Sequence, residues 1–278
     1  MIRVRTMNTI LGTALTAVLS IPLVIGPASS AAEPARKAAS TDLRVMSYNI
    51  HHGHPWDSDI YDDPPDLNRT ARNIERINPD IVMIQEVNKN HPAGDGVDQP
   101  AKLARLLGMH VVFGDNHPDE DKKAGNAVLS RFPVEEVANT PLPSRPGGAR
   151  RHLQSVRVDV NGTPALVYNT HLEPDPEWRQ KQARKVLDEI GRIDGPTLLT
   201  GDFNAKPSGD IHGWVENHGF VDAWQERPKG DGFTWRADKP SKRIDYVFAS
   251  SDFDIVDVGV HDTVASDHRP VRIDLRLP

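Results

Sequence analysis

The sequence contains no cysteine among its 278 residues. It can therefore form no disulfide bond, offers no thiolate to a metal, and has no residue that could carry the lipid of a lipoprotein. Aromatic residues are also few, at 6%. Hydrophobic residues still make up 37% of the chain, enough for a sizeable core in one domain or a small pair. Packing and bound ions must supply the stability that cross-links cannot.

An excess of positive charge is absent as well. The chain carries 33 Lys and Arg against 39 Asp and Glu, which gives a formal net charge of -6. A protein with this balance has no overall attraction for nucleic acid or for an anionic membrane. An anionic substrate must therefore be bound by a local basic cluster or by a metal ion.

The first 32 residues differ in composition from the rest. Arg3 and Arg5 precede an apolar run from Ile10 to Gly26, and small residues follow as far as Ala32. This order predicts a secretory signal peptide over residues 1–32, and a secreted protein with no stable membrane insertion after its removal. A membrane anchor is the alternative, because the run of about 17 residues is close to the shortest membrane span.

Strand and helix patterns alternate along the remaining chain, with residues 33–41 as a linker and residues 42–278 as one domain. The dipeptide Asn161-Gly162 between two alternating segments predicts a β-hairpin. The mixture favours a four-layer α/β sandwich, two packed mixed β-sheets flanked by helices, over a doubly wound parallel sheet. Apolar periodicity predicts helices over 67–78, 99–108 and 176–193. It predicts strands over 43–50, 80–87, 109–114, within 125–133, over 151–160 and 164–172, from Pro196 to the GDFN segment, and in three segments after residue 242.

Polar side chains recur where the predicted strands end. A single Asp or Asn at such a place is most often a turn former. Recurrence at so many strand ends is better explained by one shared site on a rigid scaffold. The residues are Asn49, Glu86, His171, Asp202, Asn204, Asp245, Asp267 and His268.

The chemical types in this set suit one task. Carboxylate and amide oxygens without thiols are the ligands that Mg²⁺, Mn²⁺ and Ca²⁺ prefer. Histidines paired with aspartates supply proton transfer. Together they predict a centre that polarises a phosphoryl oxygen, activates water and offsets the charge on a pentacovalent phosphorus.

The motifs that hold these residues resemble, in order, those of the endonuclease/exonuclease/phosphatase superfamily. Its members include deoxyribonuclease I-like enzymes, abasic-site endonucleases, neutral sphingomyelinases and inositol-polyphosphate phosphatases. The resemblance implies the four-layer sandwich with residues 42–278 as the catalytic domain, and it is strongest to the secreted bacterial branch. The motifs are SYN at 47–49, IQE at 84–86, GNAVLSR at 125–131, NTHL at 169–172, GDFN at 201–204, RIDYVF at 243–248 and SDHRP at 266–270.

The resemblance also implies which residues bind metal. Glu86 would be the principal metal ligand with Asn49 beside it, and Asp267 would assist a metal. The expected ion is Mg²⁺, with Mn²⁺ or Ca²⁺ as alternatives. The histidines 51, 52 and 54 directly follow Asn49 and are a further candidate metal site, although solvated loop histidines or a single phosphate contact would give the same pattern.

Catalytic and phosphate-binding roles follow from the same resemblance. His268, oriented by Asp245, would activate water or stabilise the transition state, and Asp202 would orient or deprotonate the nucleophile. The resemblance leaves open which of these two is the general base. Four residues complete the site. Asn204 would hydrogen-bond the attacking water or a phosphoryl oxygen, His171 would contact the phosphate, and Asn126 and Arg151 would bind substrate phosphate.

The sequence thus predicts a secreted, divalent-metal-dependent phosphodiesterase that hydrolyses a P–O bond by direct attack of water. Nucleic acid, cleaved by an endonuclease, is the leading substrate class. A sphingomyelinase-like phosphodiesterase for a lipid or polyol head group, or a phosphatase, is the alternative. A non-catalytic binding module on this fold would be expected to lose Glu86, Asp202 or His268, and all three are present. We expect a monomer.

Overall fold

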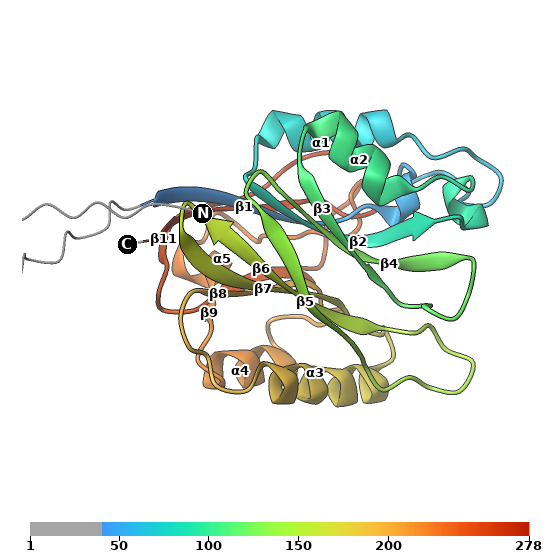
Figure 1. Ribbon diagram of the computed structural model, residues 1–278. Coiled ribbons are helices and arrows are strands. Elements are labelled where there is room, and N and C mark those ends of the chain that lie inside the picture. Colours follow the sequence, from blue (N-terminus) through green and yellow to red (C-terminus); the bar gives the residue numbers. More distant parts are fainter. Residues whose placement is uncertain (1–40, 278) are drawn as a thin grey trace, which may run out of the picture. The chain divides into compact units, whose positions relative to one another are not determined.

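The computed structural model describes residues 41–277 (Figure 1). The signal peptide predicted over residues 1–32, and all of the predicted linker except its last residue, lie outside the described residues. Within the described part of the chain, no helix has both the length and the apolar character that crossing a membrane requires.

Two mixed β-sheets of six strands each form the fold, in the orders β11-β12-β1-β2-β4-β3 and β5-β6-β7-β8-β10-β9. Each sheet contains one parallel pair, β1 with β2 and β7 with β8. The strands are β1 (Thr41–Asn49), β2 (Ile81–Lys89), β3 (His110–Asp115), β4 (Lys123–Ser130), β5 (Val134–Pro141), β6 (His152–Val160), β7 (Thr163–His171), β8 (Thr197–Asp202), β9 (Val221–Asp222), β10 (Asp245–Ala249), β11 (Asp254–Val260) and β12 (Val271–Leu277).

Side chains of the strands alternate between two apolar layers, as a pleated strand requires. In β1, Leu43 and Val45 belong to the core between the sheets, whereas Met46 and Tyr48 belong to a core on the outer face. This outer core contains α1 (Leu67–Ile77) and α2 (Gln99–Leu107). On the opposite side, α3 (Pro176–Ile190) and α4 (Asp210–Asn217) pack against the outer face of the second sheet.

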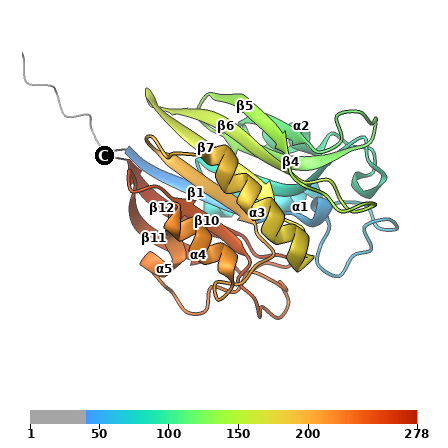
Figure 2. The same cartoon turned by 90° about the horizontal axis from the view of Figure 1, so that it is seen from below.

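The order of layers is therefore helices, sheet, sheet, helices, with α1 and α2 on one side and α3 and α4 on the other (Figures 1 and 2). This arrangement confirms the predicted four-layer α/β sandwich. The short helices η1 (His51–Gly53), η2 (Pro92–Gly94) and α5 (Ala223–Glu226) lie in the connections.

Local sequence signals explain where the elements begin and end. The side chain of Asp66 accepts a hydrogen bond from the backbone nitrogen of Arg69 and caps α1, which ends at Asn78 in the left-handed conformation. The predicted hairpin also forms, because Asn161 and Gly162 both have positive φ, at 53° and 90°. The strand β5 is not predicted from the sequence, because it is an edge strand that is interrupted by a bulge and exposes Glu135 and other polar side chains.

A buried amide ties the two sheets together near the ends of their parallel strands. Asn169 of β7 is fully buried, and its Oδ1 accepts a hydrogen bond from Nε2 of Gln85 in β2 at 2.8 Å. Its Nδ2 donates to the carbonyls of Ile84 and Ala127, at 3.0 and 3.2 Å. These bonds fix the position of β7 relative to β2 and β4.

We predict that replacing Asn169 by Leu, which has similar volume, destabilises the fold by about 2–5 kcal/mol, because buried partners in the opposite sheet would lose their hydrogen bonds. Urea unfolding followed by circular dichroism measures this loss. The same substitution at exposed Asn217, the last residue of α4, serves as the control and should change stability by less than about 0.5 kcal/mol. Equal effects of the two substitutions would contradict the role given to Asn169.

Candidate active site

Strand register brings the predicted site residues to one edge of each sheet. Asn49 ends β1 and Glu86 lies near the end of its parallel neighbour β2. In the second sheet, His171 pairs with Asp202 across β7 and β8, and Asp202 pairs with Asp245 across β8 and β10. Because adjacent strands are about 4.8 Å apart, these last three residues form one row.

A bulge in β2 determines where Glu86 points. The pairing of β2 with β4 shifts register between Ile84 and Val87. Glu86 itself has φ of 54°, an unfavourable conformation for a residue with a side chain. The bulge interrupts the alternation of the strand at this point and turns the Glu86 carboxylate toward Asn49, whose Nδ2 is 2.9 Å from Oε1.

Gly201 allows β7 and β8 to approach closely just before Asp202. It has φ of +136°, and a Cβ atom there would lie 1.9 Å from the carbonyl oxygen of Thr170. No other residue type fits without moving the strands. Phe203, the next residue after Asp202, is 2% exposed and packs edge-on against the rings of Tyr246 and Phe248. This packing fixes the position of the chain at the turn.

His268 reaches the row from the loop that precedes β12. Its Nδ1 is 2.9 Å from Oδ2 of Asp245 and must carry the proton of this hydrogen bond, because a carboxylate only accepts. Ser266 fixes the loop, since its hydroxyl donates to the carbonyl of Asn49 at 2.7 Å and accepts from the backbone nitrogen of His268 at 3.2 Å. The loop is thereby joined to the end of β1.

The Oδ2 atom of Asp202 is the meeting point of the site. Nδ2 of Asn49 lies 3.2 Å from it, Nε2 of His171 lies 3.4 Å from it, and Nε2 of His268 lies 3.6 Å from it. Glu86 joins these residues through its hydrogen bond with Asn49, and Asp245 joins them through its hydrogen bond with His268. We call the six residues the polar cluster: Asn49, Glu86, His171, Asp202, Asp245 and His268.

The neighbours of His171 determine its tautomer. Nη1 of Arg151 is 2.8 Å from Nδ1 of His171, and a guanidinium can only donate, so Nδ1 accepts and the ring proton is on Nε2. That proton faces Asp202. The side-chain nitrogen of Asn204 is 3.2 Å from Nε2 as well, but its hydrogen bond goes to the carbonyl of Leu172 at 2.9 Å.

Burial and charge act in opposite directions on the ionisable groups. Burial, together with the negative charge of Asp245, raises the pKa of Asp202 to about 7. Burial alone would lower the pKa of His268, but the charges of Asp245 and Asp202 outweigh it and hold this pKa well above the ordinary value. Burial and the neighbouring Arg151 lower the pKa of His171 well below its ordinary value, so this ring is neutral.

Glu86 differs from the other acids of the cluster. Burial alone would raise its pKa, but the adjacent imidazoles of His52 and His171 and the hydrogen bond from Asn49 outweigh burial and lower the pKa. Its side chain is 22% exposed, against 2% for Asp202 and 1% for Asp245. Glu86 is therefore an ionised carboxylate that solvent, and ions in solvent, can reach.

The donors of the polar cluster fit a divalent cation. The carboxylates of Glu86, Asp202 and Asp245 lie together in a largely buried place, which favours a positive charge among them. The donor atoms are carboxylate oxygen and imidazole nitrogen, both of which bind divalent cations. In the described chain, ligand atoms of Asp202, Asp245 and His268 also lie within 4.8 Å of one another. Asn49 presents its amide nitrogen to Glu86, and its oxygen accepts from the backbone nitrogen of His51 at 3.0 Å, so its role as a ligand stays a prediction.

The remaining predicted residues lie close to the cluster without joining it. Asn126 is buried, and its amide donates to the carbonyl of Asn169 at 3.5 Å. The carboxylate of Asp267 lies 3.4 Å from the hydroxyl of Ser266, whose proton goes to the closer carbonyl of Asn49. Contact with substrate by Asn126, and with metal by Asp267, stays a prediction.

The histidines after Asn49 do not converge on one point. Nε2 of His52 is 3.3 Å from Oε2 of Glu86, whereas Nε2 of His54 is hydrogen-bonded to the carbonyl of Ala93 at 2.8 Å. Of these, His52 belongs to the surroundings of the site. Ser266 and Asn169 lie inside the motifs SDHRP and NTHL, but no role for either is predicted from the sequence.

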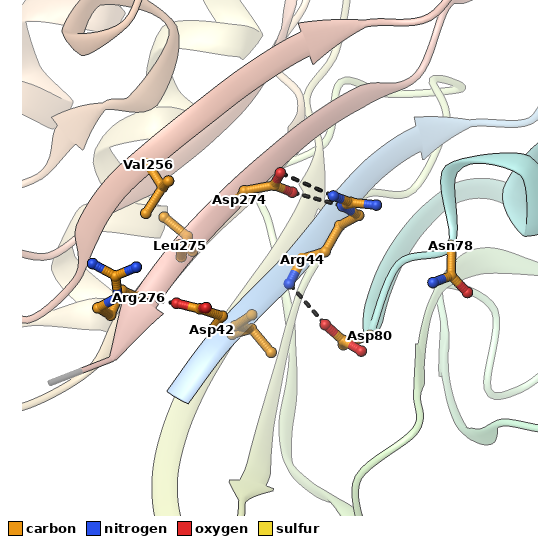
Figure 3. A pocket seen from close by; sticks show the side chains of 9 residues that line it. Asp42, Arg44, Asn78, Asp80, Val256, Asp274, Leu275 and Arg276 are labelled. Carbon is orange, nitrogen blue, oxygen red and sulfur yellow. Dashed lines mark hydrogen bonds and ion pairs between the residues drawn. The ribbon is translucent and has the colours of Figure 1, made fainter. Parts of the chain in front are cut away.

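A separate pocket lies well away from the polar cluster. It has a volume of about 360 Å³ and surrounds Arg44, near the start of β1 (Figure 3). Arg44 is five residues before Asn49, so about 16 Å of strand separates the two. Its guanidinium is hydrogen-bonded to Asp274 at 2.7 and 3.0 Å, and its backbone nitrogen donates to Asp80 at 2.8 Å. These charges bind one another and hold strands together.

We predict that replacing Asp245 by Asn lowers the pKa of His268 in metal-free protein, because the negative charge that raises it is removed while the burial that lowers it remains. The ring signals of His268 in an NMR pH titration would report the change. Replacing the exposed Asp194 by Asn should leave the pKa of His268 unchanged. A pKa that does not move in the Asp245 variant would contradict the proposed electrostatics.

Known proteins share both this fold and this sequence pattern. The family model described as "Endonuclease/Exonuclease/phosphatase family" matches residues 46–268. A crystal structure of an endonuclease/exonuclease/phosphatase from Beutenbergia cavernae DSM 12333 superposes with a TM-score of 0.75 and 33% identity, covering 85% of this chain and 72% of that chain.

More distant structures share the fold at lower identity. The mannosyl-6-phosphatase of Bacteroides thetaiotaomicron VPI-5482 has a TM-score of 0.65 and 20% identity over 84% of this chain and 99% of its own. TDP2 from Caenorhabditis elegans has a TM-score of 0.60 and 19% identity over 84% of this chain and 74% of its own.

A curated relative matches in sequence as well. The protein YbhP of Escherichia coli (strain K12) is 28% identical over 173 residues, which are 58% of this chain and 66% of that protein, just under two thirds of its length. With a family model that covers all of the polar cluster, the chain belongs to the endonuclease/exonuclease/phosphatase family.

Proposed function

We propose that the protein is a divalent-metal-dependent phosphodiesterase that hydrolyses a P–O bond in nucleic acid by attack of water. One observation carries the proposal: side chains from both sheets and from the loop before β12 converge on Oδ2 of Asp202, with Glu86 and Asp245 joined through Asn49 and His268. Stability does not require such a cluster, because several desolvated charges in one place are costly. Members of the family act as hydrolases on phosphoester bonds, which agrees with this chemistry.

The residues of the cluster divide the work of hydrolysis. A bound Mg²⁺, Mn²⁺ or Ca²⁺ ion would polarise a phosphoryl oxygen and neutralise charge in the transition state, and Glu86 would hold it. Oδ2 of Asp202 and Nε2 of His268 lie 3.6 Å apart, and the two side chains would together take up the proton of the attacking water. Asp245 would hold the ring of His268 through their hydrogen bond. Neutral His171 and its partner Arg151 would bind phosphoryl oxygens.

An aromatic side chain next to His268 favours nucleic acid among the possible diesters. Trp235 forms backbone bridges with His268 and Lys242 and is partly exposed. The ammonium of Lys242 lies 3.9 Å from the centre of its ring. A partly exposed indole beside a cation offers a base a surface for stacking and its phosphate a positive charge.

Location and assembly are also part of the proposal. The order of basic, apolar and small residues in the first 32 positions supports export, and we propose that the enzyme acts outside the cell as a monomer. An extracellular site for a protein without cysteine is consistent with stability that comes from packing.

The test is hydrolysis of several substrates in parallel, with added Mg²⁺, Mn²⁺ or Ca²⁺ and with a chelator. Plasmid DNA, RNA, sphingomyelin, phosphatidylinositol and p-nitrophenyl phosphate cover the candidate classes. We expect metal-dependent cleavage of DNA or RNA, and a loss of about 100-fold or more in kcat when Glu86 is replaced by Gln, because charge stabilisation at the phosphoryl group is lost.

Replacing the exposed Glu136 by Gln removes the same charge far from the cluster and should leave kcat unchanged. Full activity in chelator would disprove the metal requirement. Cleavage of sphingomyelin or phosphatidylinositol with nucleic acid untouched would favour a head-group phosphodiesterase. Cleavage of p-nitrophenyl phosphate alone would favour a phosphatase, the activity that the name of the Bacteroides thetaiotaomicron protein gives.

A further inference from the structure

A small cavity opens next to the polar cluster, at the residues that follow Asn204. It has a volume of about 180 Å³, and Arg179 of α3 and Lys206 line it together with Ala205. Because Ala205 is the next residue after Asn204 and successive Cα atoms are about 3.8 Å apart, the cavity begins one residue from the predicted phosphate contacts.

The two cations of this cavity are free of carboxylate partners. Within residues 41–277, neither Arg179 nor Lys206 has a carboxylate oxygen within 4.0 Å. Other cations near the site are paired: Glu173 lies 3.4 Å from Arg145 and 3.8 Å from Arg151. Arg179 and Lys206 can therefore bind an anion without first breaking an ion pair.

Arg179 is held in place but not satisfied. Its Nη1 donates to the carbonyl of Pro174 at 2.8 Å, whereas its Nε is shielded from solvent and has no hydrogen-bond partner in the described chain. Burial lowers the pKa of Arg179, whereas the charges of Asp175 and, to a smaller extent, Asp202 raise it, so both carboxylates act on the guanidinium without contacting it. Its Nη2 is neither shielded from solvent nor hydrogen-bonded within the described residues, so it can donate to a phosphate oxygen.

The rest of the lining leaves the cavity positive. Asp210 is the single carboxylate among the lining residues, against two cations. Gly209 precedes α4 without a side-chain cap, so the backbone N–H groups of the first turn have no side-chain acceptor. The start of a helix adds partial positive charge to that of Arg179 and Lys206.

We infer that this cavity is a subsite for a second phosphate group, the one adjacent to the scissile phosphate in a nucleic-acid strand. The inference rests on the proposed function, because it takes the polar cluster as the position of the scissile phosphate. A substrate with one phosphate and a neutral remainder would leave both cations unused. A nucleic-acid strand with consecutive phosphates would occupy the polar cluster and the cavity at once.

The test compares dinucleotides that differ by one phosphate. TpT contains only the scissile phosphate, and pTpT and TpTp carry one more on either side. We expect kcat/KM for one of the phosphorylated forms to exceed that for TpT by about 10- to 100-fold, as one charge-assisted contact allows. Lys206→Gln and Arg179→Gln should each remove most of this ratio while leaving kcat/KM for TpT within about twofold.

The control is Lys185→Gln on the same helix as Arg179, where the lysine pairs with Glu189. It should keep the full ratio. Lys206 is exposed, so its variant should fold normally even if Arg179→Gln does not. Equal ratios in the wild type and all three variants would overturn the subsite. A phosphate-dependent gain with glycerophosphoinositol phosphates but not with dinucleotides would overturn the assignment to nucleic acid.

A binding measurement separates this inference from the proposed function. Glu86→Gln protein in chelator cannot depend on metal, and calorimetry would give its affinity for TpT, pTpT and TpTp. We expect tighter binding of one phosphorylated form, with the gain lost when Lys206→Gln is added. That result would support the subsite even if no nucleic acid were hydrolysed. Hydrolysis without phosphate-dependent binding would overturn the subsite alone.

Discussion

The site depends on the way the two sheets are fastened to one another, and the amide of Asn169 is the central fastening. One sheet supplies Asn49 and Glu86, and the other supplies His171, Asp202 and Asp245. Apolar packing between sheets is not directional and tolerates small shifts. Hydrogen bonds from Asn169 to Gln85, Ile84 and Ala127 are directional, so they hold the two halves of the site in register to within a fraction of a residue spacing.

The parallel strand pairs explain why the site is at this edge. Each sheet contains one parallel pair, connected by a crossover through a helix, α1 in the first sheet and α3 in the second. A parallel pair places two carboxyl ends side by side, and the fastening at Asn169 brings the two pairs together. Local backbone strain at Glu86 and the close approach at Gly201 then direct the side chains. The arrangement of the strands determines where the site lies, and the strained backbone positions determine where its side chains point.

Much of this arrangement is readable from the sequence. The hairpin at Asn161 and the alternating strands follow from local patterns, and the ordered motifs indicate the family and the residues of the polar cluster. What sequence could not give depends on contacts between distant segments. The bulge that turns Glu86 and the tautomer of His171 depend on partners in other strands. Ser266 and Asn169 resemble ordinary polar residues until the structure shows what they join.

Arg179 is another residue whose role depends on contacts between distant segments of the chain. In the sequence it is one of several cations on an amphipathic helix, and its neighbours Lys181 and Lys185 form ion pairs within that helix. Only the fold brings Arg179 and Lys206 to one cavity, and within residues 41–277 it leaves both without a carboxylate oxygen closer than 4.0 Å. A net charge of -6 gives this protein no general attraction for polyanions. Under our proposal, the positive charge of Arg179 and Lys206 would therefore act on the part of a substrate that is already bound, and it would select among phosphoesters by what lies next to the scissile group.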